Sequence, residues 1–284
     1  MATFTNQATL SYNGVVTSSN VTVGELLEAV KLTKTAVTGS YRTGENVAYV
    51  VSAVNSGTVE LTGLTLSDDL GAYTFNSRSL VPLTYVADSV KYYVNGTLQP
   101  APTVSAGPPL TVSGLSIPAG GNAIIVYEAR PNQFAPLGSE NTVVNTATLS
   151  GASLTSPLTG SETIAADGTT ELNVSKALSP ATVTENAPLT YTFTIQNTGN
   201  TAVAAGSDIV LSDTFDPALN ISSVTFNGAA WASPANYAYD RSTGVFSTVA
   251  GQITVPAATY AQDPVTGVWS VTPGVSTLVI TGVI

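Results

Sequence analysis

Short stretches in which apolar and polar residues alternate run along almost the whole chain. Clear examples lie at residues 46–55, 63–67, 90–94 and 189–196, and glycine, proline or asparagine bounds each of them. Alternation places the apolar side chains on one face of a strand, and the threonine and valine that dominate these stretches favour strands. The pairs Asn95-Gly96 and Asn227-Gly228 are typical of tight hairpin turns. The pattern predicts an all-β protein.

The same pattern occurs twice along the chain. The residues Lys31-Leu-Thr-Lys34 match Asn173-Val-Ser-Lys176, and Asn55-Ser-Gly57 matches Asn197-Thr-Gly199, at one offset of 142 (176 minus 34). After a short insertion, Leu66-Ser-Asp68 matches Leu211-Ser-Asp213. A repeat of this length indicates two copies of one domain. We therefore expect two tandem β-sandwich domains at residues 25–165 and 166–284, preceded by an extension at residues 1–24.

Both copies resemble the conserved repeat domain of bacterial and archaeal surface proteins known as the domain-of-unknown-function eleven family. The matching residues are Lys34, Gly44-Glu45, Tyr49, Asn55-Ser-Gly57, Asp68 and Asn145-Thr-Ala-Thr in the first copy, and Lys176, Tyr191, Asn197-Thr-Gly199 and Asp213 in the second. The resemblance covers nearly the whole chain. It implies an immunoglobulin-like sandwich in a surface or fibrous protein, and it implies no particular ligand.

The second copy ends before its closing strands. Its last predicted strand, 277–284, aligns with residues 123–130, so nothing in it corresponds to residues 131–164 of the first copy. A sandwich of this kind would have an open groove with unpaired backbone groups and exposed core. We expect this acceptor groove to be lined by Leu278, Ile280 and Ile284.

The missing strands have a counterpart at the start of the chain. Asn6-Gln-Ala-Thr-Leu-Ser11 reads like Asn145-Thr-Ala-Thr-Leu-Ser150, and a second valine-, serine- and threonine-rich stretch follows each of them. Period-two alternation puts the following residues on one face: Phe4, Asn6, Ala8, Leu10 and Tyr12. We expect this segment to be a donor strand, so that the sequence reads as one period of a continuous two-domain array.

Three arrangements of the donor segment are open. Closure onto the second copy of its own chain is disfavoured, because the linker at residues 24–28 reaches at most about 18 Å. Insertion into the second domain of another molecule would be a β-strand addition, and this head-to-tail contact would propagate into an open filament. The segment could also be the free tail of a piece of a longer repeat protein. The alternation of the donor segment favours insertion.

Several polar residues fall on faces that are otherwise apolar. Lys34, Asp68 and Asn145 do so in the first copy, and Lys176, Asp213 and Asn6 take the same places around the second. Two hypotheses account for them. One is a Lys-Asn isopeptide bond assisted by the acid in each set, with Asn6 supplied by the neighbouring subunit. The other is a lysine–aspartate ion pair, with the asparagine bonded to nearby backbone or the residues lying in solvent.

Composition excludes several other functions. The chain of 284 residues has no cysteine and no histidine, so Ser-His-Asp and Cys-His catalysis and the common zinc sites are excluded. With only 9% charged residues and a net charge of -10, it would repel nucleic acid. We expect no enzyme activity, no metal, no cofactor, no membrane span and no signal peptide.

These observations favour a structural subunit of an extracellular, cell-surface or spore-surface filament, a pilus-like self-assembling homopolymer with no identified host or glycan ligand. The alternative is an adhesin or glycan-binding two-domain module of a longer surface repeat protein. Its binding surface would lie in the long loops around residues 229–240 and 260–268, where several aromatic residues gather.

Overall fold

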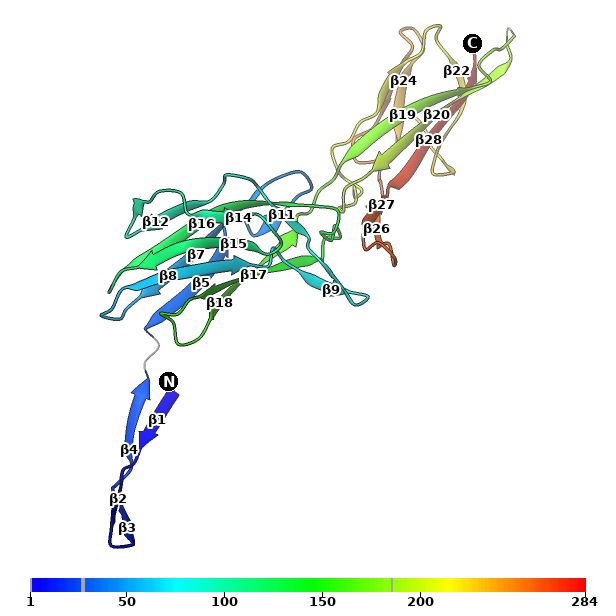
Figure 1. Cartoon of the computed structure of the whole chain (residues 1–284). Coiled ribbons are helices and arrows are strands. Elements are labelled where there is room, and N and C mark those ends of the chain that lie inside the picture. The colour runs from blue at the N-terminus through cyan, green and yellow to red at the C-terminus, as the bar shows by residue number, and fades with distance from the viewer. Residues whose placement is uncertain (1, 27–28, 185) are drawn as a thin grey trace.

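Strands, turns and loops make up all of the described chain, residues 2–26, 29–184 and 186–284, in a computed structural model. A hairpin arm, a first sandwich and a second sandwich follow one another along an elongated molecule (Figure 1). The prediction of an all-β chain with two tandem immunoglobulin-like sandwiches is confirmed. No helix of the described part is long and apolar enough to cross a membrane.

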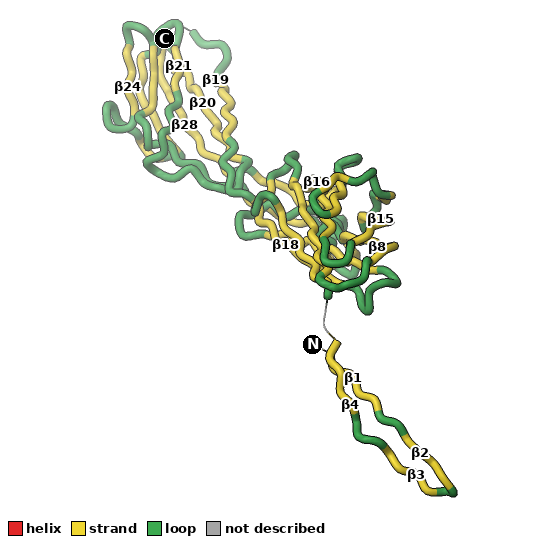
Figure 2. Tube along the Cα trace, turned by 90° about the vertical axis from the view of Figure 1, so that its left-hand side faces the viewer, coloured by secondary structure: helices red, strands yellow, loops and turns green. Residues whose placement is uncertain are grey.

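The arm is a long two-stranded hairpin that stands apart from both sandwiches (Figure 2). It consists of β1 (Ala2–Asn6), β2 (Thr9–Tyr12), β3 (Val15–Ser18) and β4 (Thr22–Leu26). β1 pairs with β4 and β2 with β3, both antiparallel, and Asn13-Gly14 with positive φ values forms the turn. An Asn-Gly turn of this kind matches the right-handed twist of the two strands that it joins.

The first sandwich consists of two six-stranded sheets. One sheet contains β5 (Val30–Ala36), β7 (Val47–Asn55), β11 (Leu83–Tyr85), β12 (Lys91–Val94), β13 (Thr97–Leu98) and β16 (Asn122–Pro131). The other contains β6 (Ser40–Tyr41), β8 (Leu61–Asp68), β14 (Thr103–Ser105), β15 (Leu110–Ile117), β17 (Thr142–Ser150) and β18 (Leu158–Ala166). A small hairpin, β9 (Tyr73–Phe75) with β10 (Arg78–Leu80), lies outside both sheets. Alternating burial along β7 and β16 fills the core between them.

The second sandwich has the same plan with fewer strands. Its larger sheet has the order β19 (Leu172–Ser179), β20 (Pro188–Asn197), β28 (Gly274–Val283), β22 (Asn220–Phe226) and β23 (Ala229–Ala230). Its smaller sheet contains only β21 (Ser212–Thr214), β25 (Val245–Thr248) and β24 (Tyr237–Asp240), and its core is a separate cluster. Among the described residues, nothing in this sheet takes the places of β17 and β18.

An inserted hairpin of the second sandwich, β26 (Thr259–Gln262) with β27 (Trp269–Thr272), turns back onto the first. The guanidinium of Arg78 donates to the carbonyl oxygen of Val265 at 2.6 Å, and the amide of Trp269 donates to that of Gln133 at 3.0 Å. One of the two segments expected to form outer binding loops, residues 260–268, is therefore engaged by the neighbouring sandwich.

Candidate functional site

The first strands of the two sandwiches present equivalent faces to very different surroundings. On β5 the inward positions Leu32 and Lys34 are buried, with Leu32 only 8% exposed. On β19 every residue is exposed, and Val174, which corresponds to Leu32, is 55% exposed. Since the alternation along both strands is the same, the difference comes from what covers them.

The hairpin of β17 and β18 covers β5 in the first sandwich. β17 pairs with β8 along its edge, with Ala147 opposite Asp68, and β18 pairs with the outer edge of β17. At Gly160 the backbone of β18 comes so close to β5 that an added Cβ atom would lie 3.2 Å from the backbone nitrogen of Lys34. The hairpin therefore closes the sandwich directly over Lys34.

The corresponding region of the second sandwich is an open groove of about 330 Å³. Leu172 and Val174 of β19, Ile209 and Leu211 ahead of β21, and Ile253 contribute to its lining. Leu211 is hydrogen-bonded to Thr248 on the side of β25, as β8 is paired with β15. On the other side of the segment that contains Leu211, no strand of the described residues pairs with it. Backbone groups that could pair with an added strand therefore lie next to exposed apolar side chains.

The predicted acceptor residues do not line this groove. β28 lies between β20 and β22, paired with both, and its residues Leu278 and Ile280 are fully buried in the core. A strand with two neighbours has no edge for a donor. Ile284 follows Val283, which pairs with Pro188 at the end of the sheet farthest from the groove-lining Leu172. The prediction of an acceptor at Leu278, Ile280 and Ile284 was wrong.

The predicted donor residues lie on the arm and are all exposed. Phe4, Leu10 and Tyr12 are 60%, 67% and 75% exposed, and Asn6 and Ala8 are exposed between them. Asn6 is opposite Thr22 in the arm, as Asn145 is opposite Glu162 in the hairpin of β17 and β18. Arm and hairpin thus share the residue pattern of their first strand and an antiparallel partner strand, although their turns differ in length.

Figure 1 places the arm and the second sandwich at opposite ends of the molecule. Asn6 is therefore not brought together with Lys176 and Asp213 of its own chain. In contrast, Lys34, Asp68 and Asn145 meet inside the first sandwich, where all three are buried.

The three buried residues of the first sandwich are linked through a fourth. Lys34 Nζ donates to Asp68 Oδ2 at 2.5 Å, and the hydroxyl of Tyr127 donates to the same oxygen at 2.7 Å. The amide nitrogen Nδ2 of Asn145 donates to the Tyr127 hydroxyl at 3.1 Å. This chain of contacts joins the amine, the acid and the amide. We call these four residues the lysine site of the first sandwich.

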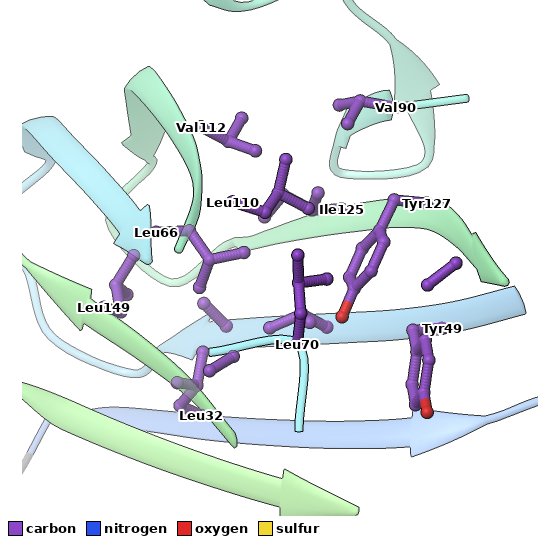
Figure 3. Close-up of a cluster of buried hydrophobic side chains, with 14 of the residues drawn as sticks. Leu32, Tyr49, Leu66, Leu70, Val90, Leu110, Val112, Ile125, Tyr127 and Leu149 are labelled. Atoms are coloured by element: carbon purple, nitrogen blue, oxygen red, sulfur yellow. The ribbon is translucent and has the colours of Figure 1, made fainter. Parts of the chain in front are cut away.

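Aromatic rings enclose the lysine site. Tyr49 and Tyr127 (Figure 3) stack with ring centroids 5.4 Å apart. Lys34 Nζ lies 4.8 Å from the Tyr49 centroid. Burial lowers the pKa of Lys34 against the opposing attraction of Asp68. Burial also raises the pKa of Tyr127 well above its usual value, and the charge of Asp68 adds to this shift. The Tyr49 hydroxyl and Asn145 Oδ1 are buried without a hydrogen-bond partner.

The second sandwich has the amine and the acid of such a site. Lys176 Nζ donates to Asp213 Oδ2, and the lysine lies 4.5 Å from the Tyr191 ring centroid. The side chain of Lys176 is 38% exposed. Ile280 pairs with Tyr191 as Tyr127 pairs with Tyr49, so this site lacks the second tyrosine.

Sequence reasoning singled out the lysines, acids and asparagines but missed Tyr127. Aromatic residues on the inward face of a strand usually belong to the hydrophobic core. The alternation therefore cannot distinguish a core tyrosine from one whose hydroxyl takes part in chemistry. The predicted alignment of the last strand was also shifted by one residue. Leu278 pairs with Phe193 as Ile125 pairs with Val51, so Ile280 corresponds to Tyr127.

No family model matches this chain, and no curated protein is similar to it. The resemblance to the surface-protein repeat domain therefore stays a prediction. Among solved structures, the major pilin subunit of Bacillus cereus is 10% identical, with 96% of this chain and 73% of that chain covered and a TM-score of 0.38.

Two further solved structures are similar to parts of this chain. A C-terminal fragment of the major pilin of Streptococcus agalactiae is 14% identical, with 62% of this chain and 67% of that chain covered and a TM-score of 0.37. The collagen-binding subdomain of an Enterococcus faecalis surface protein is 7% identical, with 50% and 99% covered and a TM-score of 0.32. Scores this low carry no functional assignment, which therefore depends on the residues of the chain itself.

Proposed function

We propose that the protein is a structural subunit of an extracellular filament, on a cell or spore surface, that assembles head to tail by strand donation. One observation carries the proposal. The face that the β17–β18 hairpin covers in the first sandwich is open in the second, and a hairpin with the same residue pattern stands exposed at the other end of the molecule. The arm of one subunit would fill the groove of the next.

The first sandwich supplies the register of this contact. If Asn6–Ser11 takes the place of Asn145–Ser150, then Ala8 lies opposite Asp213, Thr9 opposite Ser212 and Leu10 opposite Leu211, as in the pairing of β17 with β8. A shift by one residue would turn the apolar face of the arm into solvent, so the register is strongly specified.

Burial of apolar side chains supplies the driving force. Exposed residues on both partners become covered in this arrangement, including Phe4 and Leu10 of the arm and Leu172 and Val174 of the groove. Each fully buried side chain of this size contributes about 1.5 to 3 kcal/mol. A lone two-stranded hairpin is only marginally stable in water, so the arm gains stability from such cover.

The contact joins two different surfaces, the arm of one subunit and the groove of the next. After every addition, one arm and one groove therefore stay free at the two ends of the chain of subunits. A heterologous contact between opposite ends of a subunit produces an open chain rather than a closed dimer. The β17–β18 hairpin, which closes the first sandwich, is followed along the chain by β19, the first strand of the second sandwich, and the arm is followed by β5, the first strand of the first. The filament would therefore repeat the arrangement found within one subunit.

The lysine sites extend the proposal to covalent reinforcement. In the first sandwich Lys34 Nζ would attack Cγ of Asn145, forming a C–N bond and releasing Nδ2 as ammonia, with Asp68 assisting. At the groove, Asn6 of the arriving arm would complete the set with Lys176 and Asp213. Burial favours the neutral, nucleophilic form of a lysine, and closure by the arm would bury Lys176 as Lys34 is buried.

Deletion of residues 2–23 tests the filament directly. The truncated protein should remain monomeric at concentrations at which the full chain forms filaments, as seen by sedimentation and electron microscopy. A synthetic peptide of residues 2–26 should stop growth of full-length filaments and raise the thermal stability of the second sandwich. Equal assembly of the truncated and full-length proteins would show that the proposal is wrong.

Labelling with antibodies against the second sandwich tests the location. Electron microscopy of the native organism should show label along fibres on its cells or spores. Label confined to the cell interior would contradict the proposed location and leave the assembly mechanism open to its own test.

A further inference from the structure

The hydroxyl of Tyr127 lies between the acid and the leaving group of the first lysine site. It touches Asp68 Oδ2 at 2.7 Å and Asn145 Nδ2 at 3.1 Å, and Lys34 Nζ touches the same oxygen of Asp68 at 2.5 Å. Asp68 and Asn145 have no solvent access, and Tyr127 is also fully buried. A proton that leaves the lysine must reach the leaving nitrogen inside the protein.

The geometry points to Tyr127 as a catalytic proton relay that carries the proton from Asp68 to the departing Nδ2 of Asn145. This inference depends on the proposed Lys-Asn bond in the first sandwich and identifies the group that moves its proton. Asp68 alone does not fill this role in the structure, because its contacts are with Lys34, Tyr127 and the backbone nitrogen of Leu70.

The step balances without an outside reactant. The amine of Lys34 attacks Cγ of Asn145, and its proton passes to Asp68 Oδ2. In the tetrahedral intermediate the former amide nitrogen has a free lone pair and becomes a proton acceptor. Tyr127 then gives its hydroxyl proton to Nδ2 as it receives the proton held by Asp68. The C–Nδ2 bond breaks, ammonia leaves, and Asp68 and Tyr127 return to their starting protonation states.

Tyr127 reaches this place through strand pairing. β16 pairs with β7, which puts Tyr127 opposite Tyr49, and the two rings stack with their hydroxyls on the same side (Figure 3). Tyr49 provides a matched comparison, because its side chain is equally buried but its hydroxyl makes no hydrogen bond to Asp68. The two tyrosines differ in their contacts with the acid rather than in depth.

The second sandwich lacks the relay. Ile280 occupies the position of Tyr127, and the ring of Phe215 packs against Tyr191 with centroids 5.0 Å apart. No described hydroxyl in this chain donates to Asp213 there; its carboxylate accepts hydrogen bonds from Lys176 and from the backbone nitrogen of Thr214. Bond formation should therefore be faster in the first sandwich than at the junction between subunits.

The experiment compares Tyr127→Phe with Tyr49→Phe in the full chain. Each protein is made by cell-free synthesis, and samples quenched in acid are followed by intact mass for the loss of one ammonia in the first sandwich. Tyr127→Phe should slow this loss by about a hundredfold, within the range of general acid–base catalysis. Tyr49→Phe should react within about twofold of the unchanged protein, and circular dichroism verifies that both variants fold.

A second measurement separates a relay from a packing effect. When the time course of ammonia loss is followed in D₂O, the unchanged protein should react at least about twofold more slowly, because protons are transferred in this step. The rate of Tyr127→Phe should not depend on the solvent in this way. Bond formation at the unchanged rate in Tyr127→Phe would overturn the relay while leaving the bond intact. Absence of any ammonia loss in the unchanged protein would instead overturn the proposed bond itself and the relay with it.

Discussion

Lys34 and Lys176 occupy the same position in two copies of one domain, yet one side chain is fully buried and the other is 38% exposed. Each is paired with an aspartate from the facing strand. The difference between them is the hairpin of β17 and β18, which covers Lys34 and has no counterpart over Lys176 among the described residues. The second site thus has the lysine and the aspartate of the first without the hairpin that covers them.

A bulky charge on the inward face of the arm should stop assembly. Ala8 corresponds to Ala147, which is fully buried against β8. Ala8→Arg would bury an unpaired charge in the groove and should weaken association by about 3 kcal/mol or more, a factor above about a hundred. The control is Thr5→Arg, because the corresponding Val144 is 51% exposed. Sedimentation should find filaments with Thr5→Arg and monomers with Ala8→Arg; the opposite order would place the arm in another register.

Engineered cysteines can read the register, because the chain has none of its own. Thr148 lies opposite Ser67 in the first sandwich, so Thr9 should lie opposite Ser212 of the neighbouring subunit. Paired Cα atoms in antiparallel strands lie about 4.5 to 5.5 Å apart, which is within disulfide range. Thr9→Cys with Ser212→Cys should give a ladder of oligomers on a non-reducing gel after oxidation.

The matched control for the cysteine pair moves one partner by two residues. Ser11→Cys with Ser212→Cys keeps the same face of the arm but enlarges the separation to about 7 to 8 Å. It should give a much weaker ladder. Equal ladders from both pairs would mean that the arm slides in the groove or binds elsewhere.

The covalent part of the proposal predicts a mass. The subunit should weigh less than its sequence by one ammonia for each bond, and Asn145→Ala should abolish one such loss. Asn6→Ala should leave that loss in place but make filaments dissociate to monomers when boiled in detergent, whereas unchanged filaments should not. Intact mass and gel electrophoresis check both. If the subunit has the mass of its sequence and unchanged filaments dissociate to monomers on boiling, neither bond forms. Both lysine sites would then hold lysine–aspartate ion pairs.

Much of this arrangement followed from the sequence, because strand alternation fixes which side chains face inward. Lys34, Asp68 and Asn145 could be selected as polar residues on apolar faces, and the structure buries all three. The match between Asn6–Ser11 and Asn145–Ser150 likewise identified two strands that each lie in an antiparallel hairpin. These features are local or repeat at a fixed offset, so a single sequence contains them.

The rest depended on contacts that alternation does not encode. The order of strands decides which edge is open, and β28 proved to be central rather than terminal, so the predicted acceptor residues were buried. The correct alignment of β28 came from its pairing with β20, and the inserted β26–β27 hairpin packs on the first sandwich instead of forming a free loop. Tyr127 could not be distinguished from core until its hydroxyl was found on Asp68.

The unreacted lysine of the first sandwich should give stability a pH dependence of known sign. In Asn145→Ala, Lys34 stays an amine, and burial holds its pKa below the usual lysine value. The unfolded chain then binds more protons than the folded one as pH rises toward about 10.4, so the free energy of unfolding should increase with pH, by at most about 1.4 kcal/mol per unit. Above about pH 10 the gain should reverse, because the raised pKa values of Tyr41 and Tyr127 make the unfolded state lose protons first. Urea unfolding between pH 8 and 10 measures the slope. Adding Lys34→Met to Asn145→Ala should remove the contribution of Lys34 to the slope of the unfolding free energy against pH. Equal slopes with and without Lys34 would mean that its amine is charged in the folded protein throughout this range.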